Sequence, residues 1–197
     1  MRTVRCELSP RALKEYVRVA IVSDTHGFLD PRIAEVVVSC DVAVHAGDIG
    51  GVGVLRELRP RLGRVLAVRG NNDTVEKWPP GERRVLSRLT DEVVLDLPGG
   101  QLVVVHGDKA GTAQKRHDRL RKSYPDARAV VYGHSHHTVC DRRQKPWLLN
   151  PGAAGRSRTF GGPSCLLLVA SERGWQVSQI KFEPLQPSSP GRFLPRR

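Results

Sequence analysis

Val19-Ala20-Ile21-Val22-Ser23-Asp24-Thr25-His26 is an apolar run that ends in residues able to bind a metal ion. Buried parallel strands have such continuous apolar sequences, because both faces of their sheet are covered. Four further apolar runs end in the same way, in the polar segments Gly47-Asp48, Gly70-Asn71-Asn72-Asp73, His106-Gly107 and Gly133-His134-Ser135-His136. Open α/β sheets bind ligands beyond the carboxyl ends of their strands. The pattern therefore predicts strands that bring Asp, Asn and His side chains to one metal-centred site.

The sequence around these runs predicts an α/β fold of two packed mixed β-sheets flanked by helices, an αββα sandwich. Strand and helix patterns alternate from Val17 onward. The Pro79-Pro80-Gly81 cluster breaks regular structure, and it predicts a loop over the site between 74 and 84. The other expected elements are helices at 31–38, 52–58 and 111–123, a hairpin of 92–97 with 101–105, and strands at 128–132, 164–170 and 174–182.

One domain is expected over residues 17–183, which is long enough for a single hydrophobic core. Residues 1–16 contain Pro10 and form the expected N-terminal leader, with a short helical turn. Residues 184–197 combine four prolines with Ser and Arg, and this composition predicts a disordered tail.

Composition narrows the class of protein further. No apolar run approaches the ~18 residues that span a bilayer, and the charged N-terminus lacks the apolar core of a signal peptide. The four cysteines form no C-x-x-C pair, which favours free thiols in a reducing cytoplasm over disulfides or a thiolate zinc site. The net charge of +12 favours an anionic substrate. The basic residues are spread along the chain, so nucleic-acid binding is not supported.

Seven residues are candidate metal ligands. Asp24 and His26 are two residues apart, as are His134 and His136, so in extended chain each pair can face one cavity. Carboxylate and imidazole together bind Mn, Fe, Zn or Ni better than Ca, which prefers oxygen ligands. Two metals about 3.5–4 Å apart also need a bridging anionic ligand, and a carboxylate serves this purpose. The candidates are Asp24, His26, Asp48, Asn71, His106, His134 and His136.

The series D-x-H, G-D, G-N-x-D, V-H-G and G-H-x-H resembles the motifs of the calcineurin-like metallophosphoesterases. It is most similar to their small prokaryotic phosphodiesterase branch, whose members also carry Asn-Pro-Gly after the G-H-x-H, as at Asn150-Pro151-Gly152. The resemblance covers residues 17–182. It implies a small phosphorylated substrate and two divalent metal ions, with Mn favoured and Fe, Ni, Zn, Co or Mg as alternatives.

The resemblance also implies a role for each residue. Asp24, His26 and His136 would bind one metal, and Asn71, His106 and His134 the other. Asp48 would bridge both, and a hydroxide between the metals would attack phosphorus in line with the leaving oxygen. Asp73 would orient a ligand histidine through its other ring nitrogen. The catalytic residues implied in this way are Asp48, Asn71, Asp73 and His106.

One position departs from the larger phosphatases of the superfamily. Those enzymes have His directly after the motif Asn, where it helps the leaving group to depart, and this chain has Asn72. An amide cannot donate a proton as an acid, so efficient cleavage of esters with poor leaving groups is not expected unless another residue supplies the proton. Together with the resemblance, this position favours diesters over monoesters. Either His117 or His137 could substitute as the acid, although a solvated or packing role is expected for both.

Substrate contacts are expected from Asn72, Arg156 and Arg158. Arg can hold a phosphate in a bidentate manner, although a solvated basic loop explains 156–158 equally well. Arg69, just before Gly70, could likewise hold the phosphate or be a solvated basic residue. The basic residues from 109 to 122 are expected to form a solvated helix face, and the Asn-Pro-Gly segment to close the wall of the site.

We therefore expect a cytoplasmic two-metal phosphoesterase, with phosphodiesters as its favoured substrates. Three alternatives are a phosphomonoesterase of the same superfamily, a nuclease, and a non-catalytic interaction module like the retromer subunit that shares the fold. The absence of an accessory DNA-binding domain argues against the nuclease, and the complete set of seven ligands argues against the interaction module. The sequence leaves the natural substrate and the oligomeric state open.

Overall fold

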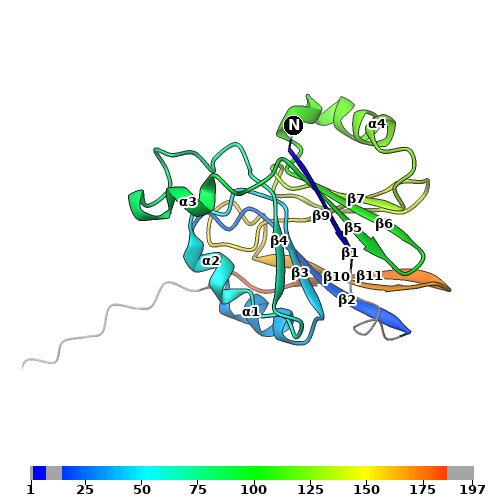
Figure 1. The fold of residues 1–197 in the computed structure, drawn as a ribbon, viewed down its shortest axis with the longest axis horizontal. Helices are drawn as coiled ribbons and strands as arrows, with labels where there is room; N and C mark the ends of the chain where they lie inside the picture. The colour runs from blue at the N-terminus through cyan, green and yellow to red at the C-terminus, as the bar shows by residue number, and fades with distance from the viewer. Residues whose placement is uncertain (1, 8–14, 186–197) are drawn as a thin grey trace, which may run out of the picture.

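The computed structural model describes residues 2–7 and 15–185 of the chain. Two β-sheets pack face to face, and helices cover the outer face of each, as Figure 1 shows. The expected αββα sandwich is confirmed. No helix in these described residues is long and apolar enough to cross a membrane.

Eleven strands form the two sheets of the described chain. The six-stranded sheet has the order β1-β5-β6-β7-β9-β8, and the five-stranded sheet has the order β11-β10-β2-β3-β4. The strands are β1 (Thr3–Glu7), β2 (Tyr16–Val22), β3 (Val42–His45), β4 (Arg64–Ala67), β5 (Glu92–Leu97), β6 (Gly100–Val105), β7 (Ala129–Val131), β8 (Thr138–Asp141), β9 (Trp147–Pro151), β10 (Ser164–Ser171) and β11 (Gly174–Lys181). The helices are α1 (Pro31–Val38), α2 (Val52–Glu57), α3 (Arg83–Leu86) and α4 (Ala113–Ser123), with single 3₁₀ turns η2 (Pro80–Glu82) and η3 (Asp108–Ala110).

Burial on both faces explains the apolar sequence of β2. Val19 and Ile21 point into the central core between the two sheets, while Ala20 and Val22 pack under the helices that cover the outer face. All four side chains are fully buried. From residue 19 to residue 22 neither face of the strand meets water, so this part carries no polar residue before it reaches the edge of the sheet.

The helices also bury apolar side chains against the sheets. Ile33 and Val37 of α1 are fully buried against the five-stranded sheet, and the side chain of Asp30 caps the helix by accepting from the backbone N–H of Arg32 at 3.0 Å. Such a cap contributes about 1 kcal/mol to helix stability. On the other side of the molecule, Leu120 of α4 packs against the six-stranded sheet.

The expected hairpin is confirmed as β5 and β6, which pair antiparallel, and helices and strands occupy the other predicted places within a few residues. The prediction of an irregular segment between 74 and 84 was wrong, because Pro80–Glu82 forms a 3₁₀ turn that continues into α3. Proline suits the first turn of a helix, since its missing N–H has no partner there. Strands β8 and β9 were not predicted.

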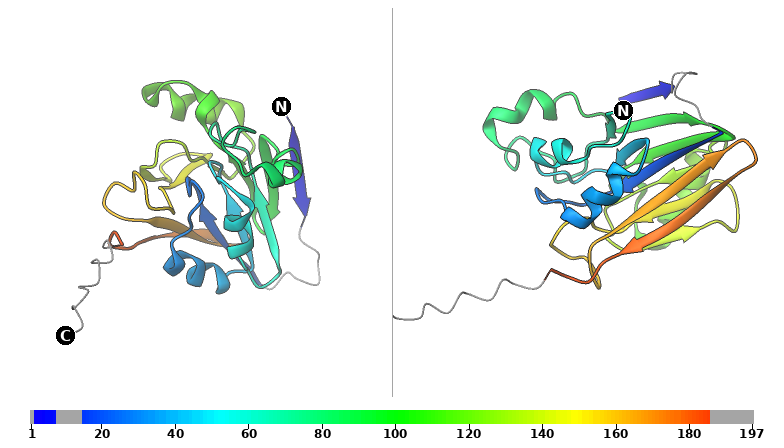
Figure 2. Two further views of the ribbon diagram at one scale, coloured as in Figure 1. Left: turned by 90° about the vertical axis from the view of Figure 1, so that its left-hand side faces the viewer. Right: turned by 90° about the horizontal axis from the view of Figure 1, so that it is seen from below.

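The N-terminal leader also differs from expectation. Its described part, Thr3–Glu7, is a strand that runs parallel to β5 at the edge of the six-stranded sheet, shown in dark blue in Figure 2. The expected helical turn is absent from residues 2–7, and Pro10 lies outside the described residues. The predicted disordered tail lies outside them too, apart from its first two residues, 184 and 185.

The topology places the polar segments at the junction of the two sheets rather than along one sheet. Strands β2, β3 and β4 are parallel in one sheet, whereas β6, β7 and β9 are parallel in the other. The loops that follow the carboxyl ends of both sets meet, and the candidate ligands lie in these loops.

Candidate metal centre

A first group of ligand atoms gathers where the loops after β2, β3 and β7 meet. Atoms of Asp24, His26, Asp48 and His136 all lie within 4.8 Å of one another and could hold a metal ion. Nε2 of His136 is 3.4 Å from Oδ1 of Asp24 and 3.3 Å from Nε2 of His26. Two imidazole nitrogens and two carboxylates that face one point match the ligand set of a transition metal.

A second group lies beside the first. Oδ1 of Asn71 is 3.0 Å from Nε2 of His106 and 2.9 Å from Nδ1 of His134. His106 donates from Nδ1 to the carbonyl of Ala46 at 2.8 Å, which leaves its Nε2 facing the centre. A backbone carbonyl that fixes the far nitrogen in this way is typical of a metal-binding histidine.

Asp48 connects the two groups. Its Oδ1 lies 3.4 Å from Nε2 of His106, and its Oδ2 lies 3.9 Å from Nε2 of His26. The side chain is 2 % exposed. One oxygen thus faces each group, which is the arrangement that a bridging carboxylate requires. The structure brings together all seven residues that the sequence nominated.

Five of the seven candidates have a left-handed backbone: Asp24, His26, Asp48, His134 and His136, with φ between 49° and 65°. Such a conformation costs a residue with a side chain about 1–3 kcal/mol, and it clusters at functional sites. The glycines nearby are needed for space. A Cβ on Gly70 would collide with the backbone N and Oδ1 of Asp48, and one on Gly133 would collide with Oγ of Ser23.

Electrostatics favour a cation in the centre. Burial raises the pKa of Asp24 to about 7, so a neighbouring positive charge would stabilise its carboxylate form. Burial lowers the pKa of His106, but the hydrogen bond and negative charge of Asp48 outweigh this effect and raise it to about 9. For Asp48, burial is likewise outweighed by His106 and Asn72, and its pKa falls well below the usual range. Asp48 is therefore an anion at any physiological pH.

Asp73 supports the centre by a route that differs from the prediction. Its Oδ1 accepts from the backbone N–H of Ile49 and Gly50, at 2.9 and 3.0 Å, and from Nε1 of Trp78 at 2.8 Å. Its Oδ2 accepts from the backbone N–H of Gly70 at 2.8 Å. The expected hydrogen bond to a ligand histidine is not found among the described residues. The carboxylate instead fixes the loops that carry Asp48 and Asn71.

His45 is a supporting residue that the sequence analysis missed. It is fully buried, Nδ1 accepts from the backbone N–H of Gly47 at 3.2 Å, and Nε2 lies 2.9 Å from Oγ1 of Thr25. Thr25 donates in turn to the carbonyl of Ile49 at 2.9 Å. This chain ties the loop after β2 to the loop after β3. The available signal was a histidine inside an apolar strand, two residues before Gly47.

The Asn-Pro-Gly segment supports the loop after β7. Nδ2 of Asn150 donates to the carbonyl of Gly133 at 2.9 Å and to Oγ of Ser135 at 3.1 Å. Its Oδ1 accepts from the backbone N–H of Gly152. Asn150 is fully buried, so these bonds hold the loop that carries His134 and His136.

Of the three residues predicted to contact the substrate, two lie at the centre and one does not. Arg158 donates from a terminal nitrogen to Nε2 of His26 at 2.9 Å, so its guanidinium reaches the centre. Arg156 instead lies over the ring of Phe28, 3.6 Å from the ring centroid. Asn72 lies at the centre and donates to both oxygens of Asp48, at 2.8 Å from its backbone and 2.6 Å from its side chain.

Neither substitute acid that the sequence offered lies free at the centre. Nε2 of His117 is 2.7 Å from the hydroxyl of Tyr132, and the ring of His137 stacks on Phe160 with centroids 3.9 Å apart.

The basic residues from 109 to 122 were predicted to form a solvated helix face. This prediction was only partly right, because Arg116 of α4 is buried.

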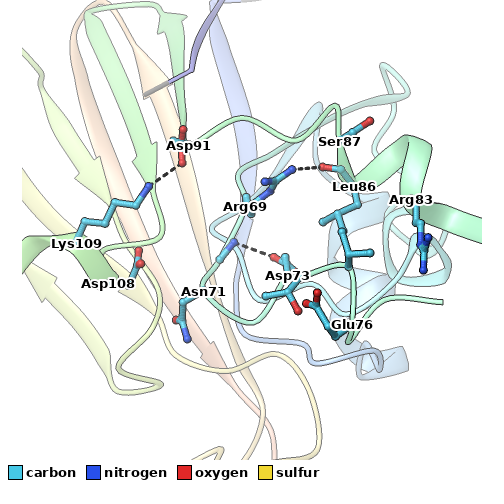
Figure 3. A pocket seen from close by; sticks show the side chains of 13 residues that line it. Arg69, Asn71, Asp73, Glu76, Arg83, Leu86, Ser87, Asp91, Asp108 and Lys109 are labelled. Atoms are coloured by element: carbon cyan, nitrogen blue, oxygen red, sulfur yellow. Dashed lines mark hydrogen bonds and ion pairs between the residues drawn. The ribbon is translucent and has the colours of Figure 1, made fainter. Parts of the chain in front are cut away.

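A cleft of about 660 Å³ opens beside Asn71. Figure 3 shows Lys109 and Asp108 on one side of it and Arg83 and Glu76 on the other, with Arg69 between them. Lys109 pairs with Asp91 at 2.8 Å, while Arg69 donates to the carbonyl of Leu86 at 2.6 Å. A smaller cavity of about 200 Å³, lined by His106, adjoins this cleft. Charged side chains thus line the cleft, which is continuous with the Asn71 side of the centre.

Known proteins share this fold. A predicted phosphoesterase from Streptococcus pneumoniae matches with a TM-score of 0.58 and 21% identity, covering 88% of this chain and 94% of its own. Vps29 of Entamoeba histolytica, in a structure complexed with Zn²⁺, matches with a TM-score of 0.60 and 16% identity, covering 83% and 98%. At these identities the likeness establishes the fold.

Sequence comparison reaches further. Phosphodiesterase MJ0936 of Methanocaldococcus jannaschii is 23% identical over 147 residues, which are 69% of this chain and 83% of that protein. The sequence model of the calcineurin-like phosphoesterase superfamily domain matches residues 17–173, so most of the chain and all seven candidate ligands lie within the match. The chain therefore belongs to the calcineurin-like phosphoesterase superfamily.

Proposed function

We propose that this protein is a dinuclear-metal-dependent phosphodiesterase. The observation that supports this most directly is the position of Asp48, whose two oxygens face two separate groups of ligand atoms. Asp24, His26 and His136 would hold one ion, and Asn71, His106 and His134 the other. Mn²⁺ is the favoured ion, and Fe, Ni, Zn, Co and Mg ions suit the same mixed N/O ligand set to different degrees.

The chemistry divides between the ions and the chain. When bound, two divalent ions lower the pKa of water enough to supply hydroxide at neutral pH, and they neutralise charge on the phosphoryl oxygens. Asp48, Asn71 and His106 place this chemistry at one point between the two sheets. Asp73 acts as a positioning residue, since it fixes the backbone directly after Asp48 and the backbone directly before Asn71.

Arg158 is proposed to hold the phosphate. Its guanidinium contacts His26 at the solvent side of the centre, where a phosphate oxygen would arrive. Arg binds phosphate through two parallel N–H groups, which also orient the ester for in-line attack. Arg156 would contribute only after leaving the ring of Phe28.

A diester is favoured over a monoester because the centre offers room for a second substituent. The cleft beside Asn71 is large enough for an organic group, and its polar lining suits one that carries hydroxyls or charge. Asn72 removes the acid that larger phosphatases use at this position. A small phosphodiester is therefore the proposed substrate, and a phosphomonoester is the alternative.

The proposal is tested by hydrolysis of bis-p-nitrophenyl phosphate and p-nitrophenyl phosphate. The protein is stripped of metal and then supplied separately with Mn²⁺, Ni²⁺, Co²⁺, Zn²⁺ or Mg²⁺. We expect metal-dependent turnover, with the diester cleaved faster than the monoester. Asp48→Asn should lower kcat/KM by on the order of 100-fold or more and lose at least one bound metal, because the bridging charge is gone. Full turnover in Asp48→Asn would contradict the bridging role.

Two rival functions give different results. A nuclease would cleave single-stranded or duplex DNA at physiological salt, whereas we expect no cleavage at comparable enzyme concentrations. A non-catalytic interaction module is suggested by the shared fold of Vps29. Such a module would hydrolyse neither ester with any metal.

We also propose a cytoplasmic location. The structure describes all four cysteines, and all four are free thiols, as is usual in a reducing compartment.

A further inference from the structure

Lys77 reaches the centre through Asn72. Its ammonium donates a hydrogen bond to Oδ1 of Asn72, whose Nδ2 donates in turn to Oδ2 of Asp48 at 2.6 Å. The backbone N–H of Asn72 also donates to Oδ1 of Asp48 at 2.8 Å, so Asn72 is fixed at both ends. A cationic acid is therefore held two hydrogen bonds from the carboxylate that faces both groups of ligands.

A rigid turn places Lys77 there. The backbone N–H groups of Lys77 and Trp78 both donate to the carbonyl of Thr74, at 3.2 and 3.0 Å. Trp78 is 2 % exposed, and its Nε1 donates to Asp73. Lys77 therefore precedes a buried anchor, and its exposed side chain turns back toward Asn72.

The other candidate acids near the centre are engaged elsewhere. His117 bonds to Tyr132 and His137 stacks on Phe160. Lys109 pairs with the carboxylate of Asp91. Arg158 reaches His26, but a guanidinium keeps its proton at any physiological pH. Among the described side chains, Lys77 is the acid that combines a transferable proton with a position beside Asp48.

We propose that Lys77 is the general acid that protonates the leaving oxygen of the phosphodiester. This inference rests on the proposed phosphodiesterase function. The attacking hydroxide forms the new bond to phosphorus, the ester P–O bond breaks, and its electron pair passes to the leaving oxygen. That oxygen takes a proton from Nζ, and the neutral amine regains one from water. The leaving group departs on the Asn72 side, where the turn 74–76 lines the cleft.

The dependence of rate on the leaving group distinguishes proton donation from other roles. An acid accelerates departure of a basic oxyanion by about 10²–10⁴-fold, whereas p-nitrophenolate leaves well without a proton. The substrates are methyl p-nitrophenyl phosphate and methyl phenyl phosphate, which differ only in the leaving phenol. The variants are Lys77→Met, which keeps the length of the side chain, and Lys77→Arg, which keeps the charge.

We expect Lys77→Met to cleave the p-nitrophenyl ester within about twofold of wild type and the phenyl ester about 100-fold more slowly. Lys77→Arg should share the defect, because guanidinium does not release its proton. Metal stoichiometry and affinity, measured by mass spectrometry and titration calorimetry, should match wild type in both variants. Lys115→Met, on the exposed side of α4, is the matched control and should behave as wild type.

Three results would overturn the proposal. Equal losses for both esters would indicate a structural role, and rescue of the phenyl ester by Lys77→Arg would indicate an electrostatic one. Unchanged rates for both esters in Lys77→Met would exclude any role in bond cleavage. Failure of the phosphodiesterase function itself is distinguishable, because wild type would then cleave neither ester and Asp48→Asn would change nothing.

Discussion

His45 shows how one buried side chain can make the metal-free protein sensitive to acid. It is fully buried, and burial together with the neighbouring His106 lowers its pKa to about 3. Its Nδ1 accepts from the N–H of Gly47, so a proton there would place two donors face to face. The folded state therefore excludes the charged form, while the unfolded chain takes up a proton near pH 6.5.

The contribution of His45 to the free energy of unfolding should therefore fall as the pH drops from 7 to 4.5. Below pH 6.5 the unfolded state binds a proton at His45 that the folded state does not, and this favours unfolding until the pH reaches about 3. Between pH 7 and pH 4.5 this contribution falls by on the order of 3 kcal/mol. Urea denaturation in EDTA at a series of pH values measures it.

His45→Gln is the control for this prediction, because glutamine does not titrate. Asp24, with its pKa raised by burial, acts in the opposite direction over part of the same range, so the difference between the two proteins isolates His45. A pH dependence of stability that is identical in wild type and His45→Gln would contradict the assignment.

Among the elements, the loops after β3 and β4 behave as one unit because Asp73 joins them. Its carboxylate accepts from Ile49, Gly50 and Gly70 of the two loops and from Trp78 of the following turn. All four are N–H donors, and the side chain is 2 % exposed. A single carboxylate thus sets the relative position of the segments that carry Asp48, Asn71 and Lys77.

Asp73→Asn should destabilise this unit, because the amide nitrogen replaces one accepting oxygen with a donor. We expect the free energy of unfolding to fall by about 2 kcal/mol, since hydrogen bonds to a charged acceptor contribute about 1.5–3 kcal/mol each. Metal affinity should fall about 10–100-fold, as is usual when a residue that supports the ligands is lost. Urea denaturation and calorimetric titration with Mn²⁺ measure the two effects.

Trp78→Phe is the matched comparison, because it removes one donor and keeps most of the packing. Its loss of stability should be smaller, about 1 kcal/mol. If Asp73→Asn were as stable as wild type and bound Mn²⁺ equally well, the two loops would be held together by other contacts.

At the scale of the whole molecule, the centre lies where two sheets meet. One group of ligands combines the loops after β2 and β3 of one sheet with the loop after β7 of the other. The second combines the loop after β4 with those after β6 and β7. A metal bound there would link the two layers, and it would stabilise the folded state in proportion to its affinity.

Metal binding should therefore raise the melting temperature. At a free concentration 100 times its Kd, one ion stabilises the folded state by about 2.7 kcal/mol. For a chain of this size that corresponds to a rise of about 5–10 °C. Calorimetry of the EDTA-treated protein before and after addition of Mn²⁺ measures the shift. Asp48→Asn should show a smaller rise, and an equal rise in both proteins would show that Mn²⁺ binds elsewhere.

Much of this architecture could be predicted because its signals are local. The second half of β2, from residue 19 to residue 22, is apolar because both of its faces are buried, and α1 begins at Pro31 because proline suits a first turn. Strand β8 was missed because Thr138–Asp141 is only partly buried and has no apolar run, and β9 was missed because it ends in Asn150-Pro151, which is typical of a turn. The turn η2 was missed because a Pro-Pro-Gly sequence is compatible both with an irregular loop and with the first turn of a helix.

Local sequence was enough to predict the residue types at the centre and their attachment to strand ends, since apolar runs and the polar residues that end them are local features. The three-dimensional structure was needed to show which strands belong to which sheet, that Asp73 binds Trp78 rather than a histidine, and that Lys77 reaches Asn72. The physical reason is that a hydrogen-bond partner depends on where a loop returns in space. That path is set by packing between residues distant in sequence, which no local pattern records.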